Sequence, residues 1–139
     1  VWRLEASGSV IVKQGINPSF DLSGFSGSKF FSIIDNSFTE LNMDSLSITD
    51  IDVYAMENLT ELSLFDNLIT EINVSNNPVL SRLFINGNNL STRSKDNIFN
   101  ALDASGLSNG LLDIDSGRSS DSDAAKASLM SKGWSITEF

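Results

Sequence analysis

Acidic side chains dominate the reactive groups of this sequence. The chain has 18 Asp and Glu residues against 9 Lys and Arg residues, a formal net charge of −9 at pH 7, and no His or Cys. Imidazole acid–base chemistry, thiolate nucleophiles, disulfides and zinc sites built from Cys and His therefore have no residues to carry them. The chemistry that remains is that of carboxylates, hydroxyls and carboxamides.

The densest run of possible metal ligands is DIDSGRSSDSD, residues 113–123. Asp113, Asp115 and Gly117 occupy alternate positions, as at the start of a calcium-binding loop. In that loop, however, glycine comes one place later and Glu holds the twelfth position, which is Ala124 here. The later acids of the run suit the first turn of a helix. We therefore predict no metal and no cofactor, with calcium near this run as the alternative.

Other kinds of chemistry have little support. A glycoside hydrolase needs two carboxylates at a fixed separation, and the spacing of the acids selects no pair. A serine hydrolase lacks both a histidine and a G-x-S-x-G turn. The acidity of the chain disfavours nucleic acid, and no apolar run reaches the roughly 18 residues that span a bilayer. We predict that the chain is not an enzyme, with a carbohydrate-active enzyme as a remote alternative.

The elements that must position these side chains are repeated. Leu59, Leu62, Leu64 and Asn67 form the pattern L-x-x-L-x-L-x-x-N, which recurs 21 residues later from Leu80 to Asn88. A preceding unit begins at Phe38 with apolar residues at the same offsets. This pattern and period are those of a leucine-rich repeat, in which each unit has one short strand and stacked units share a core.

The repeats predict five strands, near residues 41, 62, 83, 112 and 134, in one parallel sheet. The last strand is aligned by placing Trp134 opposite Leu112. Two helices interrupt the later units. The first, SKDNIFNALDASG, is expected to start at an N-cap Ser94 and to stop at Gly106. The second, DSDAAKASLMSK, is expected to start at one of two serines, Ser120 or Ser122, and to stop before Gly133.

The N-terminal part is predicted to close one end of this stack. Alternating residues on either side of Ser7-Gly8-Ser9 predict a β-hairpin cap, and the aromatic stretch 16–36 predicts degenerate first coils. The fold class is thus an α/β solenoid: a short leucine-rich-repeat stack with one parallel sheet, a hairpin cap and two helices in the C-terminal coils. We expect a single domain over 1–139, with the cap and degenerate coils at 1–37, repeats at 38–111 and a C-terminal capping coil at 112–139.

Residues 38–90, with their V-S-N-N-P segment, resemble leucine-rich repeats of the 21-residue bacterial and bacteriophage type. The tail, from ALDASG to WSIT, resembles the C-terminal end of such proteins. The resemblance implies non-enzymatic recognition of a protein or a cell-surface glycan, in an extracellular position or on a virion surface. The alternative is a self-assembling structural subunit, a homo-oligomer or larger assembly that uses its caps and edges.

In such a fold the strand residues between the buried ones point to the concave face of the sheet, where partners usually bind. Phe65 and Phe84 lie diagonally on adjacent strands, so they form either a binding hot spot or a pair that packs on itself. Asn67 and Asn88 are expected to form a structural ladder that satisfies buried backbone groups. The predicted binding residues are Phe65, Phe84, Glu40, Glu61, Arg82, Asp44 and Asp113.

Overall fold

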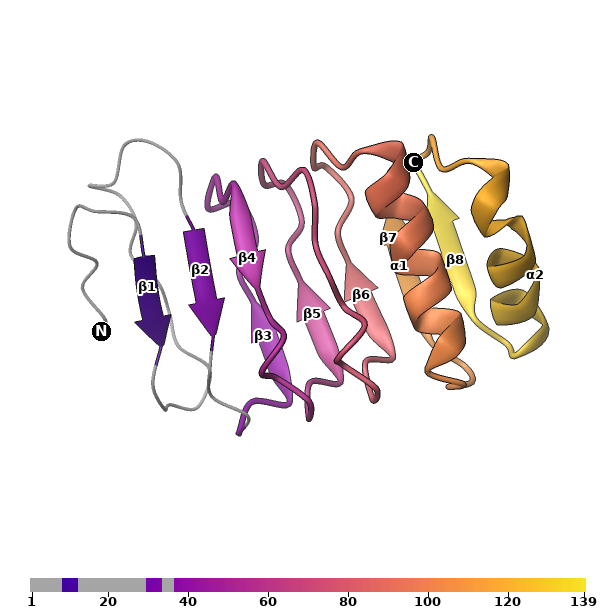
Figure 1. The fold of residues 1–139 in the computed structure, drawn as a ribbon, viewed down its shortest axis with the longest axis horizontal. Helices are drawn as coiled ribbons and strands as arrows, with labels where there is room; N and C mark the ends of the chain where they lie inside the picture. Colours follow the sequence, from indigo (N-terminus) through magenta and orange to yellow (C-terminus); the bar gives the residue numbers. More distant parts are fainter. Residues whose placement is uncertain (1–8, 13–29, 34–36) are drawn as a thin grey trace.

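A computed structural model describes residues 9–12, 30–33 and 37–139 of the chain. These residues form two parallel β-sheets and two α-helices, an α/β mixed fold (Figure 1). The elements follow one another along the long axis of the molecule in two layers. One layer is a five-stranded sheet, and the other holds the smaller sheet followed by the two helices (Figure 1).

The larger sheet confirms the predicted five parallel strands. Its order is β3-β5-β6-β7-β8, and the strands span Glu40–Asn42, Glu61–Ser63, Arg82–Phe84, Leu111–Ile114 and Ser135–Glu138. The first three strands pair in register at the 21-residue spacing of the sequence, so that Leu41, Leu62 and Leu83 lie side by side. All three leucines are buried.

The predicted register of the last strand is wrong by two residues. Ile136, rather than Trp134, lies opposite Leu112. Trp134 precedes the strand and is buried, and its Nε1 donates to the carbonyl of Leu107 at 2.8 Å. Its ring occupies the space beside Gly110, where an added Cβ would lie 2.5 Å from ring atoms. The indole therefore fills a gap left by a glycine instead of joining the row of strand side chains.

A second sheet was not predicted from the sequence. β1 (Ser9–Val12), β2 (Phe30–Ile33) and β4 (Asp50–Asp52) pair in parallel in the order β1-β2-β4. The signal was present in the spacing, because Val10, Phe31 and Ile51 lie side by side at intervals of 21 and 20 residues. The expected hairpin and degenerate coils lie mostly outside the described residues, and the portion inside them, β1, pairs in parallel with β2.

Helix α1 (Thr92–Ala104) begins three residues earlier than predicted. Ser91 is its N-cap, and the Ser91 side chain accepts from the backbone N–H of Ser94. Ser94 itself is buried, and its hydroxyl accepts from the backbone N–H of Ile72 at 3.3 Å. The helix ends at Ser105, and Gly106 follows with the positive φ of +74° that favours glycine.

Helix α2 (Asp123–Ser131) follows a 3-10 turn over Ser120–Ser122 and packs against α1. Ser122 holds the N-cap position, as one of the two predicted serines, but its side chain makes no capping hydrogen bond. The Ser122 hydroxyl donates instead to Asp96 of α1 at 2.6 Å. No helix among the described residues has both the length and the apolar character needed to cross a membrane.

The asparagine ladder is present. Asn67 is buried; its Oδ1 accepts from the backbone N–H groups of Leu46 and Ile48, and its Nδ2 donates to the carbonyls of Met43 and Leu64. Asn88 repeats the pattern one unit later, with Nδ2 donating to two carbonyls and Oδ1 accepting one N–H. A carboxamide can do this because it carries donors and an acceptor together.

A second buried asparagine, Asn77, joins its own turn to the matching turn of the unit before it. Its Nδ2 donates to the carbonyls of Val53 and Met56 at 3.0 and 2.9 Å. Its Oδ1 is buried and has no hydrogen-bond partner within the described part of the chain. The sequence assigned Asn77 no role beyond its place in the V-S-N-N-P segment, so this structural role was missed.

Candidate functional site

The outward side of the five-stranded sheet carries most of the predicted binding residues; we call it the sheet face. In β3, β5 and β6 the central leucine is buried, and in β3 Glu40 and Asn42 are exposed on either side of Leu41. Pairing places Glu40, Glu61 and Arg82 side by side across three strands. The repeat register therefore aligns these side chains in a row.

The row is joined by an ion pair and a ring contact. Arg82 Nη1 lies 3.2 Å from Glu61 Oε2, and the Arg82 guanidinium carbon lies 5.9 Å from the centre of the Phe84 ring. Arg82 thus bridges an acid on one strand and an aromatic ring on its own strand. Because a guanidinium over a ring face is attracted to it, the Phe84 ring has a fixed neighbour.

Phe65 is the exposed aromatic of the sheet face. Its exposed fraction is 43%, while Phe84 is half-buried beside Ser63 in the register. The two phenylalanines lie diagonally, as predicted. The ring contact of Phe84 in the described chain is the one with Arg82, and no ring contact with Phe65 is found there. Phe65 is therefore available to a partner rather than paired with Phe84.

Asp44, one of the predicted binding residues, positions Phe65. Its Oδ1 accepts from the hydroxyl of Ser63 at 2.6 Å and from the backbone N–H of Phe65 at 2.8 Å. Both hydrogen bonds connect neighbouring strand units, so the carboxylate fixes the backbone that presents the Phe65 ring. Asp44 was predicted to contact a partner directly, and the structure shows that it also positions the backbone of Phe65.

Asp115 also fixes the backbone of a neighbouring unit, further along the sheet. Its carboxylate accepts from the backbone N–H groups of Gly87 and Asn88, each at 3.0 Å. A calcium loop would use the Asp115 carboxylate as a ligand, and these two hydrogen bonds already engage it. Within residues 9–12, 30–33 and 37–139, no group of three or more acidic side chains is arranged to hold a metal ion.

The remaining acids give the sheet face its charge. Glu40 is exposed and Asp113 is half-buried, and together with Glu61 and Asp44 they place four carboxylates around the single cation Arg82. A surface of this kind attracts basic groups and repels polyanions. The predicted binding residues that lie in strands, Glu40, Glu61, Arg82, Phe84 and Asp113, therefore share one face, and Phe65 is the most exposed apolar residue of the predicted set.

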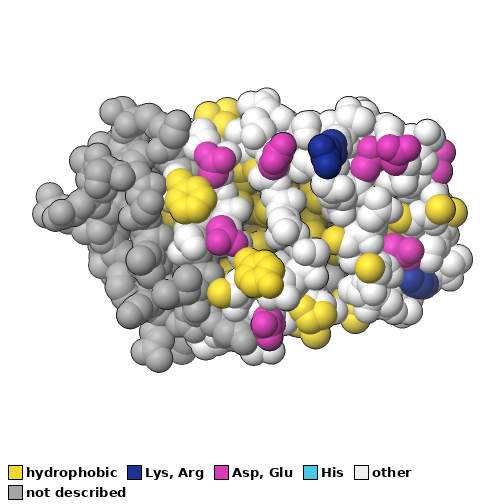
Figure 2. Space-filling model, in the orientation of Figure 1, with side chains coloured by type: hydrophobic (Ala, Val, Ile, Leu, Met, Phe, Trp, Pro, Cys, Tyr) yellow, Lys and Arg dark blue, Asp and Glu magenta, His cyan; other side chains and the backbone are white. Residues whose placement is uncertain are grey.

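A groove on the opposite layer was not predicted. Its volume is about 720 Å³, and it lies between β4, the extended segment 71–75 and α1. Figure 2 shows this face hollowed, with apolar atoms in the floor of the hollow. The apolar lining residues are Ile51, Ile72, Val74 and Ala101. The one signal in the sequence was the break in the repeat at Arg93, where α1 replaces an outer strand.

Charged groups beneath α2 form a separate network. Arg118 pairs with Asp123 and Glu138, and Lys126 also pairs with Glu138 at 2.9 Å. The hydrogen bond that Arg118 donates to Asp123 raises the pKa of Arg118 above its ordinary value. Burial alone would raise the pKa of Glu138, but hydrogen bonds from Lys126 and Arg118 outweigh it and hold that pKa below its usual range.

Asp96 is the buried acid of this network. It accepts from the backbone N–H and hydroxyl of Ser119 and from the hydroxyl of Ser122. Burial opposes its ionisation, yet these hydrogen bonds and the charge of Arg118 lower the pKa of Asp96 overall. Because each oxygen is used to join α1 to the turn before α2, we assign the network to stability.

Comparison with protein-family models, with curated proteins and with solved structures gives no match to this chain. The sheet face and the groove are therefore interpreted from their own geometry.

Proposed function

We propose that the chain is a leucine-rich-repeat solenoid that serves as a non-enzymatic binding module, and that its sheet face recognises a partner protein. The repeat assignment is supported by the 21-residue register of three strands and by the equivalent hydrogen bonds that the Nδ2 groups of Asn67 and Asn88 donate to the unit before each. The observation that carries the binding proposal is the exposed Phe65 ring, whose backbone is fixed by Asp44.

An aromatic side chain on a fixed backbone is a favourable anchor for a protein interface. It buries a large apolar area on contact, and little backbone entropy is lost because the strand is already ordered. The polar residues around it match the usual rim of an interface. The excess of carboxylates favours a partner with basic groups next to an apolar pocket, and a glycan on this face is the alternative.

The test replaces the aromatic pair. A Phe65→Ala/Phe84→Ala variant and a Met130→Ala control are immobilised and exposed to extracts of the source cells or virions. Met130 is a suitable control because it is exposed to 58% and lies on α2. We expect a captured protein to be retained by the wild type and the control, and to fall at least about tenfold with the double variant. Equal capture by all three proteins contradicts the proposal.

Self-assembly is the second candidate, and one observation favours it. Among the described strands, β8 pairs along one edge only, and the neighbouring Phe139 is 60% exposed. An open strand edge is a template for pairing with another chain. Size-exclusion chromatography with light scattering separates the candidates, because a monomer at high micromolar concentration excludes assembly through this edge. Display on a virion or cell surface stays a prediction from the resemblance.

A further inference from the structure

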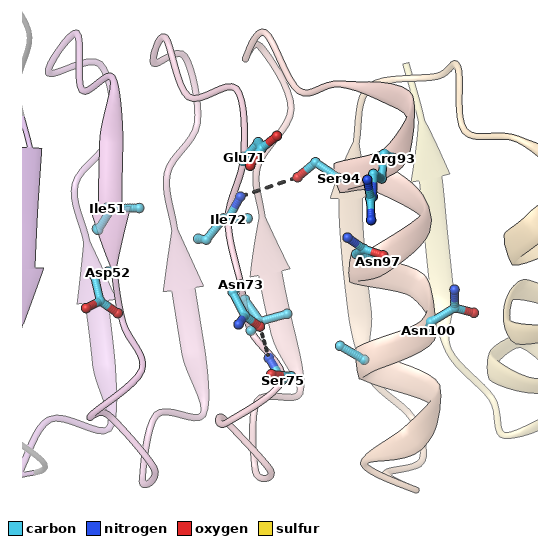
Figure 3. A pocket seen from close by; sticks show the side chains of 12 residues that line it. Ile51, Asp52, Glu71, Ile72, Asn73, Ser75, Arg93, Ser94, Asn97 and Asn100 are labelled. Atoms are coloured by element: carbon cyan, nitrogen blue, oxygen red, sulfur yellow. Dashed lines mark hydrogen bonds between the residues drawn. The ribbon is translucent and has the colours of Figure 1, made fainter.

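The groove opposite the sheet face has two polar walls. Asp52 of β4 stands on one side, Arg93, Asn97 and Asn100 of α1 stand on the other, and Glu71 and Asn73 lie on the segment between them (Figure 3). The groove exists because α1 takes the place of an outer strand. The backbone N–H of Ile72 bonds to Ser94 of α1, and segment 71–73 does not join β4 in the smaller sheet.

Most of these polar groups have no partner among the residues that the structure describes. In the described part of the chain, the side chains of Glu71, Arg93, Asn97 and Asn100 make no hydrogen bond or ion pair, and the backbone groups of Glu71 and Asn73 are also unpaired. Asn73 uses only its Oδ1, which accepts from the backbone N–H of Ser75 at 3.0 Å. The groove thus presents free donors and free acceptors side by side above an apolar floor.

This combination fits a particular chemistry. Sugar hydroxyl groups both donate and accept, so neighbouring hydroxyls can satisfy carboxamides, a carboxylate and a guanidinium in one row. The C–H faces of a sugar ring suit the aliphatic floor. Two carboxylates and one guanidinium line the groove, so its polar groups include both signs of charge, and the net charge of −9 opposes an anionic polysaccharide. The volume of about 720 Å³ lies within the usual range for ligand sites.

An aromatic ring stands beside the groove. Tyr54 is 59% exposed; its backbone N–H donates to Asp52 Oδ1 at 2.9 Å, and its carbonyl accepts from Asn76 at 2.7 Å. These bonds place its backbone next to Asp52, which lines the groove, and next to Asn76, which follows the lining residue Ser75. A sugar ring bound in the groove can continue onto the Tyr54 ring by stacking.

We propose that this groove binds a neutral oligosaccharide, with Asn97 and Asn100 hydrogen-bonding its hydroxyls and Tyr54 stacking against a terminal ring. The site is separate from the sheet face and does not depend on the proposed function. A chain carrying both would contact a protein on one layer and a glycan on the other.

Amide NMR of the whole chain tests the proposal. Cellohexaose, maltohexaose and chitohexaose are the probes, with a hexamer of galacturonic acid and a neutral Ser/Ala hexapeptide for comparison. We expect at least one neutral sugar at millimolar concentration to shift the amide signals of residues 71–75 and 93–101. Absence of shifts with all three sugars overturns the proposal, as does binding of the anionic hexamer or the peptide alone.

Variants locate the binding. Asn97→Ala/Asn100→Ala should weaken sugar binding about tenfold or more, because two carboxamides are lost and alanine suits an exposed helix position. Asn89→Ala, the same substitution in an exposed turn, should leave it unchanged. Tyr54→Ala should weaken it and Tyr54→Phe should restore it, since stacking needs only the ring. Sugar-induced shifts confined to the sheet face, or equal affinity in the Asn97/Asn100 variant, reject the groove as the site.

Discussion

Two regions of this molecule hold similar strands by different chemistry. In residues 37–90, the amide-ladder region, buried asparagines join successive units through neutral hydrogen bonds. In residues 91–139, the helical region, Asp96, Asp103, Arg118 and Glu138 join the helices to the turns and strand around them. The asparagine ladder can continue as long as each unit ends in the same turn. Where helices replace those turns, the chain needs a different set of contacts.

Among the variants that test this comparison, Asn67→Ala is expected to lower the free energy of unfolding most. Asn67→Ala removes the side-chain partner of two backbone N–H groups and of the Met43 carbonyl in a buried place, while the Leu64 carbonyl keeps its bond from Asn88. We expect the free energy of unfolding to fall by about 4 kcal/mol, since each unsatisfied buried group costs about 1–3 kcal/mol and such costs are not fully additive. Urea unfolding at pH 7 measures this change.

The matched control is Asn89→Ala, an exposed asparagine one residue after the ladder, where we expect a change within about 0.5 kcal/mol. Asn88→Ala should fall between the two, because Asn88 is half-buried and makes fewer hydrogen bonds. A loss below about 1 kcal/mol for Asn67→Ala would show that the ladder contributes little to stability.

A smaller effect, but one that depends on pH, is expected in the helical region. The pKa values of Asp96, Asp103 and Glu138 are all lowered in the folded protein, that of Asp103 chiefly by its hydrogen bond from Lys132. The ionised forms therefore stabilise the fold. This contribution is complete above the unfolded-state pKa values of about 4 and is lost as the pH falls through the lower folded-state values.

Asp96→Asn tests this dependence. We expect it to lower the free energy of unfolding by about 2 kcal/mol at pH 7 and to flatten the loss of stability between neutral and acid pH. Asn67→Ala, by contrast, should keep the pH dependence of the wild type. Hydrogen exchange in acid should show α1 and α2 losing protection before the strands β5 and β6. Simultaneous loss in both regions would remove the distinction between them.

The smallest effect is expected for Glu61→Gln, which breaks the ion pair on the sheet face. Arg82 is exposed in this pair, and exposed pairs contribute about 0–1 kcal/mol. We expect a change of at most about 0.5 kcal/mol in unfolding free energy at low salt, and less at high salt. A larger change would mean that the sheet face carries stability and is less free to serve a partner.

The sequence predicted most of the larger sheet because one spacing governs it. Leu41, Leu62 and Leu83 occupy the same offset in each unit, and the strands pair at that offset. The error at Trp134 arose because a strand pattern does not reveal that a ring will fill the space beside Gly110. The second sheet was missed because β1 was expected to belong to a hairpin and β2 to degenerate coils.

The sites were predictable to different degrees. The sheet face follows from alternation along a strand, so Phe65, Phe84 and the row of charged residues could be named in advance. The role of Asp44 could not, since it depends on a hydrogen bond to the next unit. The groove depends on how far α1 displaces segment 71–75 from β4, and no local pattern encodes that displacement.

The carbonyl of Leu64 receives the Nδ2 groups of both Asn67 and Asn88, at 3.0 and 2.8 Å. Each asparagine thus uses one carbonyl of its own unit and one of the unit before it. A copied 21-residue unit inserted between these two asparagines brings its own asparagine, whose Nδ2 donates to a carbonyl of the unit before it. It also brings a carbonyl that accepts from the asparagine of the unit after it. Gene duplication could therefore lengthen this protein one unit at a time without inventing a new contact.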